Sequence, residues 1–392
     1  MSDTAPAREQ SPSVGVPNGM FDLAPVAPNE RIHALDLLRG FAMFGVLWSN
    51  LNDHYGTRAP ATALDGGLAW AQVHLIESRF YTLLCLLFGI GFGMQLLRAT
   101  ERGVDVRTVY YRRSLALLGI GLVHGWLIWH GDILTMYALV AFSLVMFRSV
   151  RPRRLLIGGI LLWLPGFIAI TIGANLAGMK YFMPSILRSA TTKWMFAHGS
   201  WAQIEPIRVA AHLEWLGHWG LPFFANVLGL FMVGLWATKS GYLRRVIEVP
   251  DTTKLLLLGG LVAVLPDFVL TEMPWSTLGG AAVYAAVLLL LWQQPRMAPL
   301  LRPLAATGRM ALTTYLTQSV VCTLLFYGYG LGWYGTFGYT GMFVLTLILF
   351  ACQMAASTWW LTQFSFGPVE WLWRTLTYGH MPRMRLPRLA TA

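Results

Sequence analysis

The chain has 392 residues, of which 56% are hydrophobic and 12% are charged, and its mean hydropathy is +0.54. A soluble domain of this size could not cover so much apolar surface, so the composition predicts an all-α, polytopic integral membrane protein. The formal net charge of +11 does not indicate nucleic-acid binding, because the basic residues cluster between apolar runs, as they do in cytoplasmic loops.

The first 30 residues are polar and rich in proline, which is typical of a disordered cytoplasmic tail. With roughly 17–25 apolar residues per crossing, the remainder predicts about ten transmembrane helices. They are expected near residues 34–52, 79–97, 113–130, 132–147, 155–177, 219–237, 255–272, 278–293, 309–328 and 341–361. Together they form one domain over residues 31–378, and a basic cytoplasmic tail follows over residues 379–392.

Lysine and arginine predict the orientation of these helices. Basic residues occupy loops 98–113, 148–154, 238–254 and 294–308 and the C-terminal tail, whereas loops 130–132, 273–277 and 328–340 contain none. Because basic loops stay in the cytoplasm, both termini are predicted to be cytoplasmic. The long loop 178–218 is the exception. We expect it to be extracytoplasmic and to lie partly as an amphipathic segment on the membrane surface.

The three cysteines, Cys85, Cys322 and Cys352, all lie inside apolar runs. No Cys/His spacing in the chain suits a metal site. We therefore expect neither a disulfide nor a metal ion.

The first predicted helix carries polar groups along one face. Asp36 and Arg39 are three residues apart, and Asn50, eleven residues beyond Arg39, returns to the same face at about 100° per residue. The stripe from Arg39 to Asn50 is about 16 Å long. A charge facing lipid at the bilayer centre costs roughly 2.5 kcal/mol or more, so the stripe should face the bundle interior or a passage through it. The alternative is an Asp36–Arg39 ion pair near the interface and an Asn50 that bridges helices.

Other polar groups fall into two layers. The outer layer, suited to acid–base chemistry, comprises Asn50, Asn52, Asp53, His54, His74, Glu77, Arg79, His124, His130 and Asp132. The inner layer is mostly cationic and suited to phosphate, and it comprises Arg39, Arg112, Arg113, Arg309, Glu370 and Arg374. This asymmetry predicts a phosphorylated cofactor at the cytoplasmic face and chemistry near the outer face.

Several of these residues have equally ordinary interpretations. Asp132 is suited to capping the helix that follows it. Arg112 and Arg113 can serve as stop-transfer charges. His124 can simply bond a neighbouring carbonyl inside the membrane.

Several stretches resemble the bacterial YeiB family, and the resemblance covers nearly the whole chain after residue 30. They are "RIHALDLLRGFAMFGVLWSN", "SRFYTLLCLLFGIGFGMQLLR", "RRSLALLGIGLVHGWLIWHGDILTMYALVAF", "GLFMVGLWATKSGYL", "TGRMALTTYLTQS" and "FGPVEWLWRTLTYG". The family is grouped with transmembrane acyltransferases that include heparan-α-glucosaminide N-acetyltransferase and the acyltransferase-3 proteins. The resemblance therefore implies an enzyme of the bacterial cytoplasmic (inner) membrane that uses acetyl-CoA, or another acyl-CoA, as donor.

The resemblance also implies residue roles. Asn50 matches the lysosomal enzyme, which has asparagine at this point of the first helix and uses a histidine just beyond it. His54 occupies a comparable region at a shorter spacing, so His54, His74, His124 and His130 all remain candidates for the general base, with Asp132 beside them. The expected donor-binding residues are Asp36, Arg39, Arg309, Tyr315, Gln318 and Arg374. Tyr315 and Gln318 share a helix face that can line the passage or simply bond between helices.

The expected function is transfer of an acyl group to a hydroxyl or amine of an acceptor at the extracytoplasmic face. The acceptor class stays open between a sugar, a lipid and an amine, and the chain is compatible with a homo-oligomer. Two other functions remain: a small-solute transporter, which intramembrane charges also suit, and a non-catalytic membrane scaffold. No inverted repeat is evident in the sequence, which weighs against the transporter.

Overall fold

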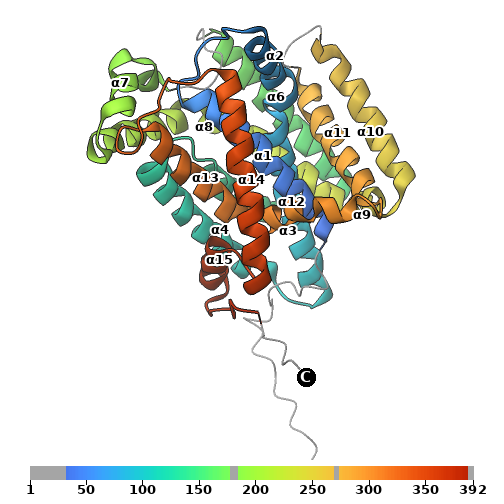
Figure 1. Ribbon diagram of the computed structural model, residues 1–392. Coiled ribbons are helices and arrows are strands. Elements are labelled where there is room, and N and C mark those ends of the chain that lie inside the picture. Colours follow the sequence, from blue (N-terminus) through green and yellow to red (C-terminus); the bar gives the residue numbers. More distant parts are fainter. Residues whose placement is uncertain (1–31, 177–183, 269–272, 387–392) are drawn as a thin grey trace, which may run out of the picture.

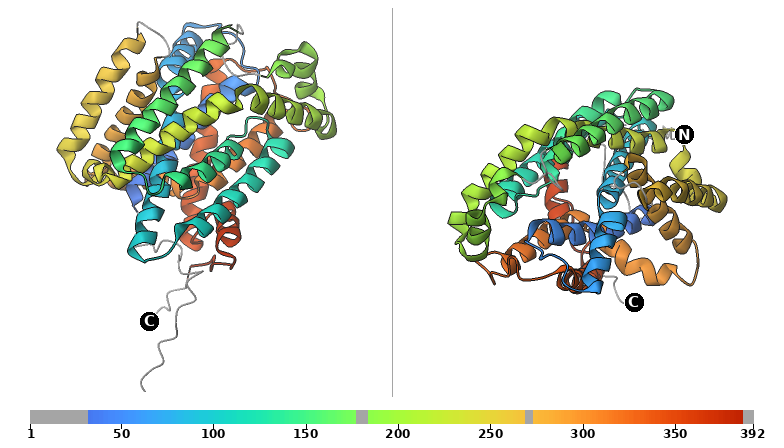
Figure 2. Two further views of the ribbon diagram at one scale, coloured as in Figure 1. Left: turned by 180° about the vertical axis from the view of Figure 1, so that it is seen from behind. Right: turned by 90° about the horizontal axis from the view of Figure 1, so that it is seen from above.

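The computed structural model describes residues 32–176, 184–268 and 273–386. Within these ranges the protein is helical and contains no strand, apart from one isolated bridge between Phe364 and Arg385, so the all-α prediction is confirmed there. Figures 1 and 2 show the helices in three views. In chain order they are α1 (His33–His54), α2 (Ala63–Ala71), α3 (Arg79–Glu101), α4 (Val106–Val123), α5 (Leu134–Leu144), α6 (Pro152–Leu176), α7 (Ala190–His198), α8 (Trp201–Lys239), α9 (Tyr242–Glu248), α10 (Pro250–Val264), α11 (Pro274–Trp292), α12 (Ala298–Arg309), α13 (Ala311–Phe326), α14 (Tyr339–Gln363) and α15 (Pro368–Tyr378).

The helices suit a membrane environment. Five helical segments of the described chain are long and apolar enough to cross a bilayer, or six if α9 and α10, bent by 106°, form one span. Two further apolar helices are shorter: Leu134–Phe147, which begins with α5, and α13. Many large apolar side chains on α6, α10 and α14 face outward, which in a membrane is the lipid-facing side. The chain is therefore a helical membrane protein with several spans.

The C-terminal part of the predicted loop 178–218 is helical. From Trp201 onward it belongs to α8, which runs without a break to Lys239 and begins with a capping box formed by Ser200 and Gln203. At 1.5 Å per residue its 39 residues extend about 58 Å, well beyond the bilayer core. Arg208 and His212 looked like loop residues in the sequence, yet both are buried against the interior. Residues 177–183 of that expected loop lie outside the described part of the chain.

Helix packing places α1 and α3 at the centre of the bundle. The helix α6 lies along α8, α10 along α11, and α1 along α12. The contact between α1 and α12 is backbone to backbone, because a Cβ on Gly308 would lie 1.8 Å from the Asp36 carbonyl oxygen. A Cβ on Gly40 would likewise lie 1.9 Å from the Leu304 carbonyl oxygen. Small residues permit this approach, which brings the end of α12 beside the polar face of α1.

Two π-helical turns lie at helix ends where the sequence carries polar residues. A π-helical turn, Gln72–Ile76, ends at Glu77, and Ser78 then adopts a left-handed φ of +60° before α3 begins. A second π-helical turn, His124–Ile128, ends α4 and leads into the hairpin before α5. Such turns are frequent at functional sites.

Candidate functional site

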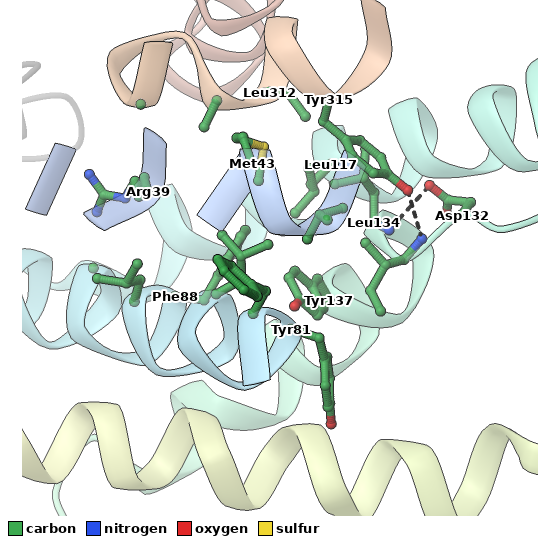
Figure 3. A pocket seen from close by; sticks show the side chains of 18 of the residues that line it. Arg39, Met43, Tyr81, Phe88, Leu117, Asp132, Leu134, Tyr137, Leu312 and Tyr315 are labelled. Atoms are coloured by element: carbon green, nitrogen blue, oxygen red, sulfur yellow. Dashed lines mark hydrogen bonds between the residues drawn. The ribbon is translucent and has the colours of Figure 1, made fainter. Parts of the chain in front are cut away.

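A cavity of about 540 Å³ runs through the bundle between α1 and α3. Its wall is completed by the start of α4, the hairpin before α5, the junction of α12 and α13, and α15. Asp36, Arg39 and Asn50 all line it, so the three polar groups of α1 do share the face that the helical period predicts. Figure 3 shows Arg39 and Asp132 toward opposite ends of this space.

One end of the cavity is basic. Arg39 bonds Asp36 at 3.0 Å, and Arg309 donates to the Ser365 carbonyl at 3.3 Å. The Arg113 guanidinium lies 3.8 Å above the Trp373 ring, and Arg374 lies 4.5 Å above Phe366. Five arginines line this end: Arg39, Arg98, Arg113, Arg309 and Arg374. Clustered guanidinium groups are suited to phosphate.

Glu370 also lines the basic end, where it holds the start of α13. It accepts hydrogen bonds from the Leu312 amide at 2.7 Å and the Thr313 amide at 3.1 Å, and from the Thr313 hydroxyl. Desolvation raises the pKa of Glu370, and the bonds from Thr313 oppose that shift. The carboxylate therefore joins α15, which carries Arg374, to the start of α13, two residues after Arg309.

The middle of the cavity is apolar. Met43, Leu117 and Leu312 approach from one side and Phe88 and Tyr137 from another, as Figure 3 shows. Asn50 lies eleven positions beyond Arg39 on α1, which corresponds to about 16 Å along the helix. The cavity therefore joins a cationic end to a distant polar end through an apolar section.

The other end carries two of the four candidate histidines, His54 and His130. Asn50 and His54 line it one helical turn apart on α1, and His130 lines it from the hairpin. The His54 and His130 rings are 5.3 Å apart between centroids. Asp53, which accepts a hydrogen bond from Ser49 at 2.8 Å, and Glu77 lie at the same end.

Asp132 lines the cavity and organises the hairpin. Its carboxylate accepts from the amides of Leu134 at 3.1 Å and Thr135 at 2.8 Å, so it caps α5. It also lies 2.8 Å from Nδ1 of His124, a pair that is almost fully buried. His124 thus stands behind Asp132 and is not among the lining residues.

Tyr315 and Gln318 have different surroundings. The Tyr315 hydroxyl accepts from the Ile133 amide and donates to the Gly131 carbonyl, both at 3.4 Å, and the residue lines the cavity. Gln318 was expected to line the same passage. It instead donates to Oε1 of Gln353 at 2.9 Å and to the Met43 carbonyl at 3.4 Å, which is the interhelical role.

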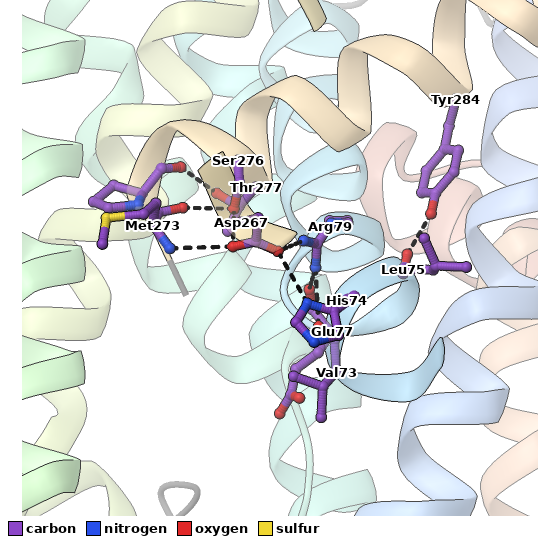
Figure 4. Close-up of polar contacts among 11 residues, drawn as sticks. Val73, His74, Leu75, Glu77, Arg79, Asp267, Met273, Ser276, Thr277 and Tyr284 are labelled. Atoms are coloured by element: carbon purple, nitrogen blue, oxygen red, sulfur yellow. Dashed lines mark hydrogen bonds and ion pairs between the residues drawn. The ribbon is translucent and has the colours of Figure 1, made fainter. Parts of the chain in front are cut away.

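His74 lies outside the cavity, in a cluster shown in Figure 4. Arg79 forms a buried ion pair with Asp267, and Asp267 also lies 3.7 Å from His74 and accepts from Ser276 at 2.8 Å. Arg79 additionally donates to the Glu77 carbonyl at 3.1 Å. The cluster therefore ties the strained turn at Ser78 to the 3-10 turn Leu265–Phe268 and to the start of α11.

Removing one partner of this ion pair should destabilise the protein strongly. Asp267→Asn leaves Arg79 buried without its counter-charge, which is expected to lower the free energy of unfolding by about 3–5 kcal/mol. Denaturant titration in mixed micelles measures the change. The double variant Arg79→Met/Asp267→Leu removes both charges and should recover most of the loss. Equal stability of Asp267→Asn and the wild type would contradict this assignment.

The sequence did not identify every residue of the cavity. Arg98 was assigned to a loop, although Gly91, Met94, Gln95 and Arg98 follow one another at helical spacing on a single face of α3. Arg112 and Arg113 could not be told apart, and only Arg113 is among the lining residues. Within the described residues, no group of three or more His, Cys, Asp or Glu side chains is arranged to hold a metal ion.

Comparison with known proteins places the chain among uncharacterized bacterial relatives. Residues 254–380 match a family model described as a protein of unknown function (DUF418). The chain is 33% identical to the uncharacterized protein YxaH of Bacillus subtilis, over 92% of this chain and 97% of the relative. It is 30% identical to an uncharacterized 39.9 kDa protein of Bacillus acidopullulyticus, over 91% of this chain and 96% of that relative. It is 29% identical to the uncharacterized protein YeiB of Escherichia coli, over 89% and 96%.

Proposed function

The chain belongs to the YeiB family, and we propose that it is a membrane acyltransferase. It transfers an acetyl or other acyl group from cytoplasmic acyl-CoA to a hydroxyl or amine of an acceptor at the opposite face. One observation carries the proposal: a single cavity joins five arginines to an asparagine–histidine cluster through an apolar section.

The donor fits the order of groups along the cavity. Coenzyme A carries its phosphates at the nucleotide end and its thioester at the end of a long, thin arm. The arginines suit the phosphates, and the Trp373 ring beside Arg113 offers a surface for the adenine. The arm then follows α1 for about 16 Å, which brings the thioester toward Asn50.

The proposed membrane topology agrees with this polarity. We propose ten spans in a bacterial inner membrane, with both termini cytoplasmic. The basic loops before α4 and before α6 then lie in the cytoplasm together with the arginine end of the cavity. The end that carries Asn50, His54 and His130 faces the extracytoplasmic side.

The reaction needs one base and one hydrogen-bond donor. His54 takes the proton from the acceptor oxygen or nitrogen, which attacks the thioester carbonyl carbon. Asn50 donates a hydrogen bond to the carbonyl oxygen as it gains negative charge. The carbon–sulfur bond then breaks, and the departing CoA thiolate receives the proton from His54. Among the four candidate histidines, His54 is favoured because it lines the cavity one turn beyond Asn50.

Binding of the donor tests the proposal. In purified protein in nanodiscs, acetyl-CoA should bind and raise the unfolding temperature, and acetyl-pantetheine, which lacks the nucleotide, should bind at least tenfold more weakly. Arg113→Gln should weaken acetyl-CoA binding about tenfold or more, because one contact to a charged group is worth about 1.5–3 kcal/mol.

Arg112→Gln is the matched control. It makes the same charge change one residue away, outside the cavity lining, and should leave acetyl-CoA affinity within about twofold of the wild type. Calorimetric titration measures both variants. No binding at millimolar acetyl-CoA, or equal losses in the two variants, would contradict the proposal.

A further inference from the structure

Arg208 is a fully buried cation that the proposed reaction does not use. It lies on the outer part of α8, and its exposed fraction is 0%. Its Nη1 donates to the Ile128 carbonyl at 3.3 Å and to the Tyr329 hydroxyl at 3.5 Å. Its Nε and Nη2 have no hydrogen-bond partner, and no ion pair joins it to a carboxylate of the described residues.

Such an arrangement is costly for a folded protein. Buried charges in proteins are normally paired, and each buried N–H without an acceptor carries a desolvation penalty. The hydrogen bond from Nη1 to the Ile128 carbonyl stabilises the hairpin. It gives no hydrogen-bond acceptor to Nε or Nη2. The Trp201 ring, 5.4 Å from Cζ, supplies a weak attraction and no hydrogen-bond acceptor at those nitrogens.

Three side chains near Arg208 also carry buried polar atoms without a hydrogen-bond partner: Tyr327, His130 and His212. Tyr327 is 0% exposed, its hydroxyl has no partner, and its ring lies 5.8 Å from that of Tyr329, whose hydroxyl Arg208 contacts. His130 is 7% exposed, and neither of its ring nitrogens has a partner. His212 is 1% exposed, and its Nε2 is likewise without a partner. Arg208 and Tyr327 therefore carry buried donors without acceptors beside two histidines whose ring nitrogens are also unpartnered, and an oxyanion is the acceptor-rich group that this cluster lacks.

The cluster adjoins the reactive end of the cavity. His130 lines the cavity, and its ring lies 5.3 Å from that of His54, while its backbone carbonyl is 3.3 Å from Nδ1 of His212. We infer that Arg208, Tyr327, His130 and His212 form a buried site for an oxyanion, a carboxylate or a phosphate, carried by the acceptor. Its assignment to the acceptor rests on the proposed acyl transfer, because it anchors the acceptor beside His54.

Anion binding to the purified protein in nanodiscs tests the inference. Sodium phosphate and sodium acetate are titrated separately, with ionic strength held constant by sodium chloride, and the unfolding temperature and tryptophan fluorescence are followed. A saturable change with phosphate alone assigns a phosphate group, and a change with acetate alone assigns a carboxylate. A change with both assigns a site for either oxyanion. No saturable change with either anion contradicts the inference.

Tyr327→Phe is the decisive variant, because loss of Arg208 itself could prevent folding. Deleting a buried hydroxyl that has no protein partner should leave the anion-free protein as stable as the wild type or more so. The same change should weaken anion binding about tenfold, through loss of one charge-assisted bond. Tyr284→Phe is the matched control, since that hydroxyl bonds the Leu75 carbonyl away from the cluster, and its anion affinity should be unchanged. Equal anion affinity in Tyr327→Phe and the wild type would overturn the inference.

The same samples separate this inference from the proposed function. Acetyl-CoA binding without any anion effect would reject the oxyanion site and leave the donor assignment intact. An anion effect abolished by Tyr327→Phe, without acetyl-CoA binding, would keep the oxyanion site and reject its role in acyl transfer.

Discussion

Asn50→Ala is expected to lower acyl transfer about 10²–10³-fold, because a single oxyanion donor contributes an effect of that size in enzymes that stabilise a tetrahedral intermediate. With water as the surrogate acceptor, the rate is measured as CoA thiol released from acetyl-CoA by the protein in nanodiscs. Acetyl-CoA affinity should change by no more than about twofold, since the phosphate contacts lie about 16 Å away.

Asn52→Ala is the control for this substitution. Asn52 is the neighbouring buried asparagine on α1, but its amide donates to the Trp48 carbonyl at 3.0 Å and it is not among the cavity-lining residues. The control should lose stability on the order of 1 kcal/mol and keep its turnover. Equal losses of turnover in the two variants would show that Asn50 acts through folding.

His54→Gln is expected to lower the same turnover about 10²–10⁴-fold, the usual contribution of a positioned base. The variant should also lose the acid limb of the pH–rate profile, because no imidazole remains to become protonated there. Measuring the rate across the accessible pH range distinguishes this loss from a general drop in activity.

His74→Gln provides the comparison for His54. His74 belongs to the same outer layer of the sequence, but it lies in the Arg79–Asp267 cluster and outside the cavity. His74→Gln is expected to lower stability, because it removes the imidazole beside Asp267, and to leave the shape of the pH–rate profile unchanged. An unchanged acid limb in His54→Gln would assign the base to another residue.

The polar face of α1 was predictable because it depends only on the helical period. Asp36, Arg39 and Asn50 line one cavity, as a rotation of about 100° per residue requires. The separation of arginines from histidines was also visible, because residues at opposite ends of a spanning helix lie at opposite ends of the bundle. The ten apolar segments overlap helices for the same local reason.

Partners distant in sequence could not be predicted. His74 lies 3.7 Å from Asp267, and Gln318 donates a hydrogen bond to Gln353; each contact depends on how whole helices pack. Arg112 and Arg113 point in directions about 100° apart on one helix, so only packing decides which of them reaches the cavity. The start of α8 was missed because hydropathy cannot distinguish a polar residue in water from a buried one such as Arg208.

The most direct test of acyl-CoA binding in the cavity is a structure of the protein in nanodiscs with a non-hydrolysable acetyl-CoA analogue. We expect continuous ligand density in the cavity, with the phosphates among Arg39, Arg113, Arg309 and Arg374 and the thioester carbonyl within hydrogen-bond reach of Asn50. A ligand bound in the reverse direction, with its phosphates near Asn50, would contradict the proposed acyltransferase site. A ligand bound elsewhere, with the cavity empty, would contradict it as well.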